Sequence, residues 1–330
     1  MASQRALSFH LRNDRWQRRA GKVARRLDEE HDFDLVHHVT VSSYWTRVGV
    51  RSVAKPLIWG PVGGGVDPPL QLLPALGPRG IIEAAARIVA RPVIALLPPI
   101  RRSHQNVTIA FAQNQNTARR IKGTERVRVL PNALTVDLGG MFEEEERTHD
   151  LLFAGRLVAW KGPMLALRAL RLLRDREAIL HYCGIGPERA RLERAARRWG
   201  LVERVRFEGY LPREELLGLL ATAGALVHPA LNEEAGLSVA EALSLGTPVV
   251  CLDHGGPSEL VRCWPESPSA LIKPASPKAT AAAVAAAVDG FLKSPPLVRR
   301  VAATAVMSYE DEVLGAYEVA AGVVGGSESA

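Results

Sequence analysis

Two glutamates stand at a spacing that suits a ligand carrying both hydroxyl groups and phosphates. Glu233 and Glu241 are eight positions apart in the segment NEEAGLSVAEALSLGTPVV, residues 232–250. The segment predicts a loop and then a helix that begins near Gly236 and stops before Gly246. Free N–H groups at the start of such a helix suit phosphate oxygens. Taken alone, the pattern also fits an ordinary surface helix.

A second segment, FAGRLVAWKGP at 153–163, predicts a strand, a tight turn and the start of a helix. It carries Arg156 and Lys161, and a guanidinium fork beside a point ammonium suits a diphosphate. Hydrogen bonds to charged groups contribute ~1.5–3 kcal/mol each, enough to hold a diphosphate without metal. For this segment by itself, plain surface charge on a loop would be the better interpretation.

The elements that must position these residues alternate between short apolar runs and helical patterns, which predicts βαβ units and parallel sheets. The expected strands lie at 34–39, 56–60, 107–111, 127–130, 151–155, 179–183, 205–209, 225–229, 248–252 and 270–272. Ligands of doubly wound sheets lie beyond the carboxyl ends of the strands. Arg156 and Glu233 each follow a strand directly, so both fall where such a ligand binds.

The length of 330 residues indicates two domains, at roughly 100–200 residues per domain. A turn at Pro131-Asn132 and the charge run EEEE mark the break. We expect two Rossmann-like domains facing a cleft, with a first domain at 1–135, a linker at 136–149, a second domain with C-terminal helices at 150–321, and a disordered tail at 322–330. We expect the first domain to lack its first βα units. A complete doubly wound domain would need about two more such units, which is ~60 residues at ~30 per unit.

Composition fits a soluble globular protein, with 47% hydrophobic and 23% charged residues. The three cysteines, Cys183, Cys251 and Cys263, are an odd number without CxxC spacing. This argues against a disulfide framework and against a zinc site, and it favours a reducing cytosol.

The basic residues gather at the start of the chain. Residues 1–26 hold eight of them against one acid, Asp14, which equals the whole formal excess of +7. Such a start is typical of a segment that binds an anionic membrane surface or nucleic acid, and equally of a solvated helix face. Nucleic acid ranks low as a partner, because this segment offers few aromatic side chains for base stacking, of which Trp16 is the largest. No apolar core follows the basic residues, so we expect no signal peptide.

The most apolar run, PVIALLPPI at 92–100, is far shorter than the roughly 20 residues that span a bilayer. Arginines flank it on both sides, at Arg87, Arg91, Arg101 and Arg102. The pattern suits either a segment that lies on a membrane surface or a buried helix that ends at Pro98-Pro99, and we favour the buried helix.

Taken together, several segments resemble the glycosyltransferases of family 4, which have the two-domain GT-B fold. In the second half these are AGRLVAWKG, YCGIGPE (182–188), FEGYLPREEL (207–216), HPALNEEAGLSVAEALSLGTPVV (228–250) and GGPSELV (255–261). They follow the family's order and span almost the whole second half. The first half is similar more weakly, through FDLVHHV, WGPVGGG (59–65) and RVLPNAL (128–134).

The resemblance implies a role for each matching residue of the second half. Arg156 and Lys161 hold the donor diphosphate and Glu233 contacts the transferred sugar, and these three form the expected catalytic set. The rest of the implied donor site comprises Gly155 and Gly184, the backbone of Gly236, Leu237 and Ser238 at sugar hydroxyls and phosphate, Glu241 at the ribose, and Tyr210 and Leu211 at the base. Family members transfer with retention and need neither metal nor another cofactor.

The acceptor side is expected in the first half. The family often places histidines three and five positions after the aspartate that opens the first of these strands. Counted from Asp34, His37 matches the first position and Val39 occupies the second, so His38 is the substitute; a core histidine is an equal alternative. Gly63, Gly64 and Gly65 either frame the acceptor side or form a plain loop. His228 and His254, near the donor loops, suit structural and functional roles equally.

Two further motifs are weaker. Asp32-Phe33-Asp34 spells the DxD metal motif of the other main glycosyltransferase fold, but it precedes a strand and so lies at the wrong end of the sheet; we interpret it as chance. Gly184-Ile185-Gly186 resembles a dinucleotide fingerprint, but Arg189 stands at the third glycine position, which argues against NAD.

A glutamate pair also suggests a glycoside hydrolase. Retaining hydrolases need carboxyl groups ≈ 5–5.5 Å apart and inverting ones ≈ 6.5–9.5 Å. The helix from Gly236 to Glu241 alone is ~7.5 Å long, at 1.5 Å per residue. Inverting spacing stays open, but it would leave Arg156 and Lys161 without a task.

The sequence therefore predicts a retaining glycosyltransferase that moves a sugar from a nucleotide-diphosphate sugar to a saccharide or lipid-linked acceptor. We expect it to work in polysaccharide biosynthesis, in the cytoplasm or peripherally on the inner face of the cell membrane. The alternative is a nucleotide-sugar-binding protein that no longer catalyses, because the first domain is short.

Overall fold

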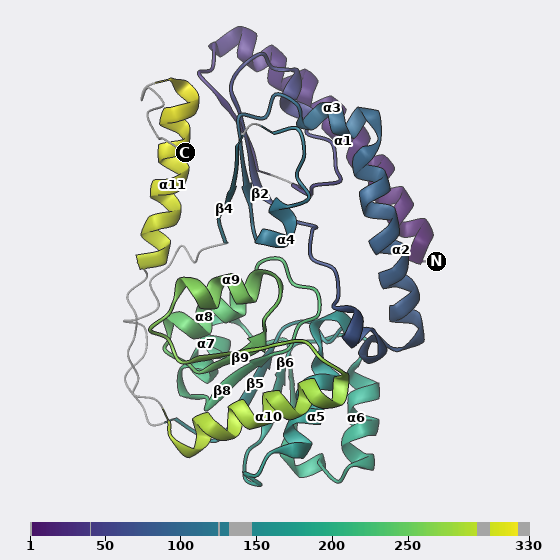
Figure 1. Cartoon of the computed structure of the whole chain (residues 1–330), viewed down its shortest axis with the longest axis vertical. Coiled ribbons are helices and arrows are strands. Elements are labelled where there is room, and N and C mark those ends of the chain that lie inside the picture. Colours follow the sequence, from purple (N-terminus) through teal and green to yellow (C-terminus); the bar gives the residue numbers. More distant parts are fainter. Residues whose placement is uncertain (1, 40, 125, 132–146, 296–303, 323–330) are drawn as a thin grey trace. The chain divides into compact units, whose positions relative to one another are not determined.

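The structure, a computed structural model, describes residues 2–39, 41–124, 126–131, 147–295 and 304–322, with the backbone alone for residues 2–11, 79 and 304–309. The chain forms two compact units (Figure 1). Unit 1 comprises residues 1–66, 87–131 and 308–330, and unit 2 comprises residues 67–86 and 132–307. Residues 136–146 of the predicted linker and 323–330 of the predicted tail lie outside the described residues.

Two segments group differently from the predicted boundaries. Residues 67–86 belong to unit 2, where Leu72 is fully buried in the larger core cluster. Most of α11 (Thr304–Ala321) belongs to unit 1, where Ala316 is buried beside Ile58 and Phe111. Sequence order does not reveal such crossings, because they depend on which apolar face a returning segment covers.

Unit 1 contains a parallel sheet with strand order β1-β2-β3-β4 in its described part. The strands are β1 (Val36–His38), β2 (Leu57–Val62), β3 (Ile109–Ala112) and β4 (Arg126–Val129). All four lie at the predicted positions. The prediction holds because each is a short apolar or alternating run rich in β-branched residues, bounded by loop-forming stretches.

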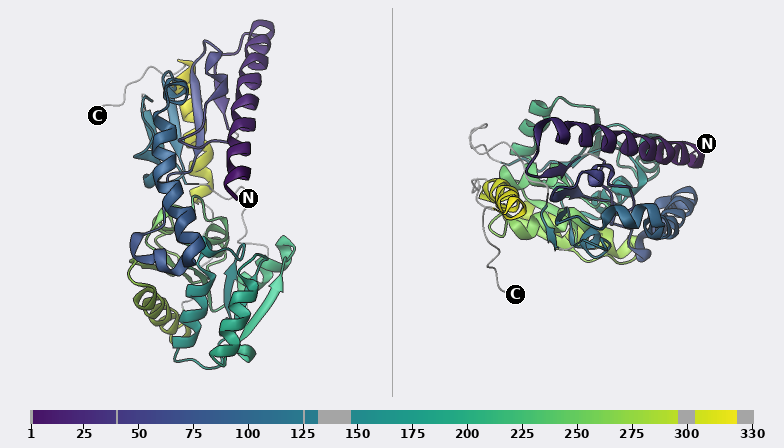
Figure 2. Two further views of the ribbon diagram at one scale, coloured as in Figure 1. Left: turned by 90° about the vertical axis from the view of Figure 1, so that its right-hand side faces the viewer. Right: turned by 90° about the horizontal axis from the view of Figure 1, so that it is seen from above.

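The two faces of this sheet are covered differently. Ile58, Ile109 and Phe111 point to α11, whereas Leu57 and Trp59 pack in a second cluster with Tyr44. Figures 1 and 2 show α11 on one side of the sheet and the other helices of unit 1 on the opposite side. Those helices are α1 (Ala2–His31), the second part of α2 (Gly77–Leu96), α3 (Pro98–His104) and α4 (Gln115–Ala118).

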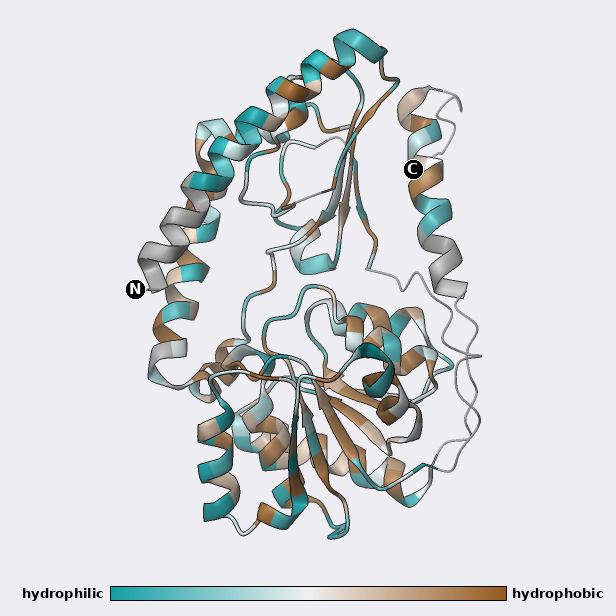
Figure 3. Cartoon of the chain, turned by 180° about the vertical axis from the view of Figure 1, so that it is seen from behind, coloured by the Kyte–Doolittle hydropathy of each residue, from teal (hydrophilic) through white to brown (hydrophobic). Residues whose placement is uncertain are grey.

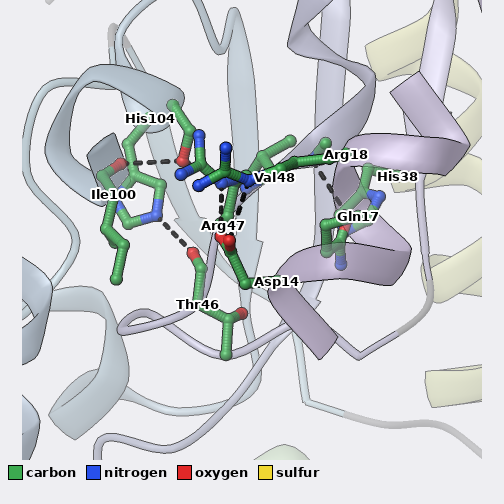
Figure 4. Close-up of polar contacts among 11 residues, drawn as sticks. Asp14, Gln17, Arg18, His38, Thr46, Arg47, Val48, Ile100 and His104 are labelled. Carbon is green, nitrogen blue, oxygen red and sulfur yellow. Dashed lines mark hydrogen bonds and ion pairs between the residues drawn. The ribbon is translucent and has the colours of Figure 1, made fainter. Parts of the chain in front are cut away.

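Polar contacts tie α1 to the chain that follows β1 (Figure 4). The carboxylate of Asp14 accepts from Arg18 Nε at 2.8 Å and from Arg47 Nε at 2.6 Å. Gln17 Oε1 accepts from the backbone N–H of Gly49 at 3.0 Å, at the start of the 3₁₀ turn η1 (Gly49–Ser52). The basic first helix is thus held against residues 47–52.

The segment 92–100 differs from the predicted buried helix that ends at the proline pair. Helix α2 ends at Leu96, and Pro98 opens α3 instead. The side chains of Val93 and Leu96 are 59% and 67% exposed. The prediction was wrong because proline fits the first turn of a helix, where its missing N–H costs nothing, and because an apolar run does not reveal whether a partner covers it.

Unit 2 contains a second parallel sheet, with strand order β10-β9-β8-β5-β6-β7. Its strands are β5 (Leu151–Ala154), β6 (Leu180–Cys183), β7 (Val205–Gly209), β8 (Ala225–His228), β9 (Val249–Leu252) and β10 (Ser269–Ile272). This is the doubly wound order, whose direction of winding reverses between β5 and β8. Several of these strands appear as brown, apolar arrows in Figure 3, and all six lie where the sequence predicts them.

Helices cover both faces of this sheet. The helices of unit 2 after β5 are α5 (Pro163–Leu172), α6 (Arg189–Arg198), α7 (Arg213–Thr222), α8 (Leu237–Ser244), α9 (Gly255–Cys263) and α10 (Pro277–Lys293). Leu165, Leu192 and Val284 place α5, α6 and α10 in one core cluster. Residues of α7, α8 and α9 belong to the other core cluster of unit 2. The loops after β5 and β8 therefore lead to opposite faces, which opens a crevice between them.

Candidate functional site

The loop after β5 carries the two predicted cations. Arg156 is exposed, and its guanidinium lies 5.9 Å from the centre of the Trp160 ring. Lys161 is mostly buried and forms an ion pair with Glu233. Burial, and next the positive charge of Arg156, lower the pKa of Lys161 from 10.5 to about 8. The ammonium is therefore cationic at neutral pH but loses its proton more readily than an exposed lysine.

The loop after β8 is fastened to the loop after β5. The backbone N–H groups of Leu231 and Asn232 donate to Trp160 O at 2.8 and 3.2 Å. Gly162 has a positive φ of 74°, and a Cβ on it would lie 2.1 Å from Pro229 O. Only glycine fits this contact, because 2.1 Å is far inside van der Waals distance. The two loops thus form one assembly at the carboxyl edge of the sheet.

Glu233 and Lys161 meet beside a buried histidine. His228, at the end of β8, is 2% exposed, and its Nε2 lies 3.9 Å from Glu233 Oε2. Neither ring nitrogen of His228 has a hydrogen-bond partner within the described part of the chain. Burial, and next the charge of Lys161, lower the pKa of His228 to about 3. The imidazole is therefore neutral under ordinary conditions and can offer one N–H donor to a ligand or to Glu233.

The predicted helix start lies at α8. Gly236 is its N-cap, with φ 78° and ψ 46°, and no side chain caps the helix. The N–H groups of Leu237 and Ser238, at the very start of the helix, are consequently available to an anion. Leu237 is 51% exposed at this end, and Ser238 Oγ donates to Ala154 O at 3.4 Å. Helix α8 therefore begins against the end of β5, in the crevice.

Glu241 lies further inside α8 and has a partner that the sequence did not predict. Arg213 Nε lies 3.4 Å from Glu241 Oε1, and the glutamate side chain is 13% exposed. Burial raises the pKa of Glu241, against the lowering effect of Arg213. Arg213 falls inside the matching segment FEGYLPREEL, so its position was the available signal.

The remaining predicted donor residues follow β5, β6 and β7. Gly155 N donates to Cys183 O at 2.9 Å, and a Cβ on Gly184 would lie 2.0 Å from Gly155 O, so these two glycines pack directly together. Tyr210 is 80% exposed after β7, and Leu211 packs against the core cluster of α7 and α8. All lie at the same edge as the two loops, because the strands are parallel.

The predicted acceptor-side histidines make structural contacts within unit 1. His37 Nε2 donates to Gly60 O at 3.1 Å, and its Nδ1 accepts from Tyr317 Oη at 2.7 Å. His38 is 6% exposed, its Nε2 lies 3.5 Å from the amide nitrogen of Gln17 (Figure 4), and burial lowers its pKa to about 4. A role at an acceptor remains a prediction for both.

The glycine triplet is also packed. Gly63 N donates to Ser42 O at 3.0 Å, and Gly65 N donates to Thr117 Oγ1 at 3.1 Å. The carbonyl of Gly64 accepts from Arg91 Nη1 at 3.2 Å. These contacts fix the loop that follows β2, and contact with an acceptor remains a prediction.

Other motifs have structural partners. Asp32, in the DxD sequence, pairs with Lys55 at 2.6 Å. His254 Nε2 donates to Asp67 O at 2.7 Å, which fastens the start of residues 67–86 within unit 2. Across the described residues, no group of three His, Cys, Asp or Glu side chains is arranged to hold a metal ion. Nor is any described helix both long and apolar enough to cross a bilayer.

Comparison with known proteins shows what this region of the chain is similar to. Residues 142–305 match the family model of glycosyl transferases group 1. These residues, just under half of the chain, are similar to the group 1 glycosyltransferases. The matched region includes the loops after β5 and β8 and the whole of α8.

Curated relatives match this region over part of their length. The chain is 37% identical to 2-deoxystreptamine glucosyltransferase of Streptomyces kanamyceticus over 106 residues, which are 32% of the chain and 27% of that protein. It is 39% identical to D-inositol 3-phosphate glycosyltransferase of Corynebacterium jeikeium over 119 residues, 33% of the chain and 28% of that protein. Glycogen synthase of Mycobacterium tuberculosis is 32% identical over 167 residues, 49% of the chain and 40% of that protein. The matched part is thus less than half of each relative.

Solved glycosyltransferases share the fold along most of the chain. Sucrose-phosphate synthase from Thermosynechococcus elongatus superposes with a TM-score of 0.57 at 19% identity, over 92% of this chain and 75% of that chain. Anabaena HepE in complex with UDP gives a TM-score of 0.55 at 16% identity, over 89% and 81%. At such identity the likeness shows the fold, and it confirms the predicted GT-B class with two Rossmann-like α/β units.

Proposed function

We propose that the chain is a retaining glycosyltransferase that moves a sugar from a nucleotide-diphosphate sugar to a saccharide or lipid-linked acceptor in polysaccharide biosynthesis. The observation that carries this proposal is the joined pair of loops at the switch point of unit 2. They bring Arg156, Lys161 and Glu233 to the crevice where the free N-terminus of α8 also lies. Cations and free N–H groups at one place suit a diphosphate, and the carboxylate suits sugar hydroxyls.

Transfer breaks the bond between the anomeric carbon and the phosphate oxygen, and forms a bond from that carbon to the acceptor oxygen on the same face. The acceptor proton passes to the departing phosphate oxygen, so the reaction is balanced. Negative charge develops on the diphosphate as it leaves. Arg156, Lys161 and the α8 N-terminus stabilise that charge, which makes a metal or other cofactor unnecessary.

Lys161 forms an ion pair with Glu233. When the diphosphate arrives, its oxygens compete for the ammonium and release the Glu233 carboxylate. A released carboxylate accepts hydrogen bonds from the hydroxyls of the transferred sugar. Glu241, which is mostly buried, accepts from the ribose hydroxyls in the same way. Each charged side chain of the site therefore gains a partner on the nucleotide sugar.

We further propose an anionic membrane surface as a partner, with the chain on the cytoplasmic side. A groove of about 520 Å³ runs between α1 and residues 47–52. Its lining contains seven basic side chains: Arg15, Arg18, Arg19, Lys22, Arg25, Arg47 and Arg51. Juxtaposed cations attract anionic lipid with about 1 kcal/mol each near the surface.

The experiment is an NMR-monitored assay with a panel of nucleotide sugars and short saccharide or lipid-phosphate acceptors, in the presence of EDTA. We expect a product whose anomeric configuration matches that of the donor. An inverted product, or a requirement for added metal, would contradict the proposed mechanism. Tight nucleotide-sugar binding without turnover on any acceptor would favour the alternative of a binding protein.

A further inference from the structure

Unit 1 contains a cavity of about 530 Å³ on the side of the sheet opposite α11. Its apolar wall is formed by the ring of Tyr44 and by Pro92, Ala95 and Leu96 at the end of α2. A volume of this size is in the range of pockets that hold small ligands. The mainly apolar wall suits a hydrocarbon chain.

Three cations stand on the lining of the same cavity, Arg101, Arg120 and Lys122. Arg120 is positioned by Tyr44, because its Nη1 donates to Tyr44 Oη at 3.0 Å and its guanidinium lies 5.5 Å from the ring centre. None of the described residues that line the cavity is acidic. The lining therefore favours an anion beside the apolar wall.

The floor of the cavity is firmly built. His104 is 3% exposed, and its Nε2 donates to Thr46 O at 2.9 Å (Figure 4). The segment that holds Thr46 also forms the ion pair of Arg47 with Asp14 of α1. The hydrogen bond of His104 to Thr46 thus fixes one wall of the cavity, and the end of α2 forms the other wall.

An exposed apolar row on α2 leads to this cavity. Val89, Val93 and Leu96 are 66%, 59% and 67% exposed and follow one another at spacings of four and three, so they share one face of the helix. Leu96 ends this row and also lines the cavity. Exposed aliphatic side chains beside cations are typical of surfaces that enter the boundary between lipid headgroups and acyl chains.

We propose that this cavity binds one anionic membrane lipid, with a hydrocarbon chain against Tyr44, Ala95 and Leu96 and the phosphate at Arg101, Arg120 and Lys122. The apolar row of α2 lies in the outer acyl region while the lipid is bound. The site belongs to unit 1 and goes beyond the proposed transfer reaction, whose donor site uses residues of unit 2.

The first experiment uses monomeric dodecyl phosphate, below its micelle-forming concentration, and isothermal titration calorimetry of the full chain. We expect one molecule to bind per chain. Arg101→Ala combined with Lys122→Ala removes two cations of the cavity and should weaken binding about 30-fold. The control, Arg102→Ala with Arg119→Ala, removes the same charge from exposed neighbours that do not line the cavity, and should leave binding unchanged. Equal weakening in both double variants would overturn a defined site.

Inorganic phosphate is the second probe and separates a lipid from a free anion. Phosphate alone should bind at least tenfold more weakly than dodecyl phosphate, because it buries no apolar surface. Equal affinities, or no binding of dodecyl phosphate at all, would overturn the proposal.

The third experiment measures co-sedimentation with phosphatidylcholine vesicles, with and without phosphatidylglycerol. Ala95→Trp fills the cavity, whereas Ala90→Trp places the same side chain elsewhere on the exposed surface of α2. Binding to the anionic vesicles should fall for Ala95→Trp and persist for Ala90→Trp. Equal binding of the two variants would contradict a lipid in the cavity, because it would show that the protein contacts the membrane by its surface alone. Equal binding to neutral and anionic vesicles would contradict the requirement for an anionic lipid. Release of nucleoside diphosphate from a soluble donor should be unchanged in every variant, so this proposal and the proposed function can fail separately.

Discussion

In the proposed donor site, Lys161 is the side chain with the most strongly perturbed environment among the predicted cations. It is buried, it forms an ion pair with Glu233, and Arg156 adds a second positive charge that helps to lower its pKa. An incoming diphosphate is the counter-ion that relieves this repulsion. The residue types were predictable from sequence, since both cations follow a strand in a short loop. The Lys161 pair with Glu233 was not, because it joins loops 72 positions apart.

The lowered pKa of Lys161 predicts a pH dependence for donor binding. The ammonium is present below a pH of about 8 and is lost as the pH rises through that value. Affinity for a nucleoside diphosphate should therefore fall above pH about 8, by up to about tenfold per pH unit. Calorimetric titrations across this range measure it. Lys161→Arg should flatten the profile, and an unchanged profile in that variant would assign the titration to another group.

Arg156 is expected to act through charge on the diphosphate rather than through folding, because its side chain is exposed. Arg156→Ala should weaken donor binding about 10- to 100-fold, as expected for a lost hydrogen bond between charged groups. Arg197→Ala, an exposed arginine of α6, is the matched control and should bind normally. Competition titration with the nucleotide sugar is the measurement, and equal affinities of the two variants would count against the assigned role.

At the scale of elements, the site depends on two loops that touch through their backbones. The strands and α8 were predictable, because apolar runs and glycine stops have a local cause. The contact of Gly162 with Pro229 was not predictable, because a glycine in a loop also serves many turns. The exposure of the end of α2 was not predictable either, because its apolar residues are equally typical of a buried helix.

Gly162→Ala tests the contact between the loops. Gly162 and Gly200 have similar φ values, 74° and 68°, but a Cβ at Gly200 meets nothing within 4 Å. Gly200→Ala should therefore lower the free energy of unfolding by backbone strain alone, about 1–2 kcal/mol. Gly162→Ala adds a clash and should cost about 1–3 kcal/mol more. Denaturant unfolding of both variants is the measurement, and equal losses would contradict a packed contact.

At the scale of the molecule, the chain crosses between units more than once. Residues 67–86 complete unit 2, and most of α11 completes unit 1. All ten strands in the described part of the chain could be predicted, because each is a local pattern. The crossings could not, because they are decided by apolar faces that meet only in the folded chain. Ile58 and Phe111, for example, are covered by residues more than 200 positions later.

Ala316→Asp tests the assignment of α11 to unit 1. Ala316 is fully buried, so a carboxylate there should destabilise unit 1 by about 3 kcal/mol or more. Hydrogen exchange should then accelerate in β2 and β3 and stay slow in β5 and β8. Leu314→Asp is the control on the same helix, since Leu314 is 56% exposed. Faster exchange in unit 2 alone would place α11 elsewhere.

Release of nucleoside diphosphate from a panel of nucleotide sugars in EDTA tests the proposed donor site most directly. The wild-type chain should release it from at least one donor, in the presence of an acceptor, whereas Arg156→Ala should be at least tenfold slower. Absence of release from every donor, or equal rates in the two proteins, would contradict the account.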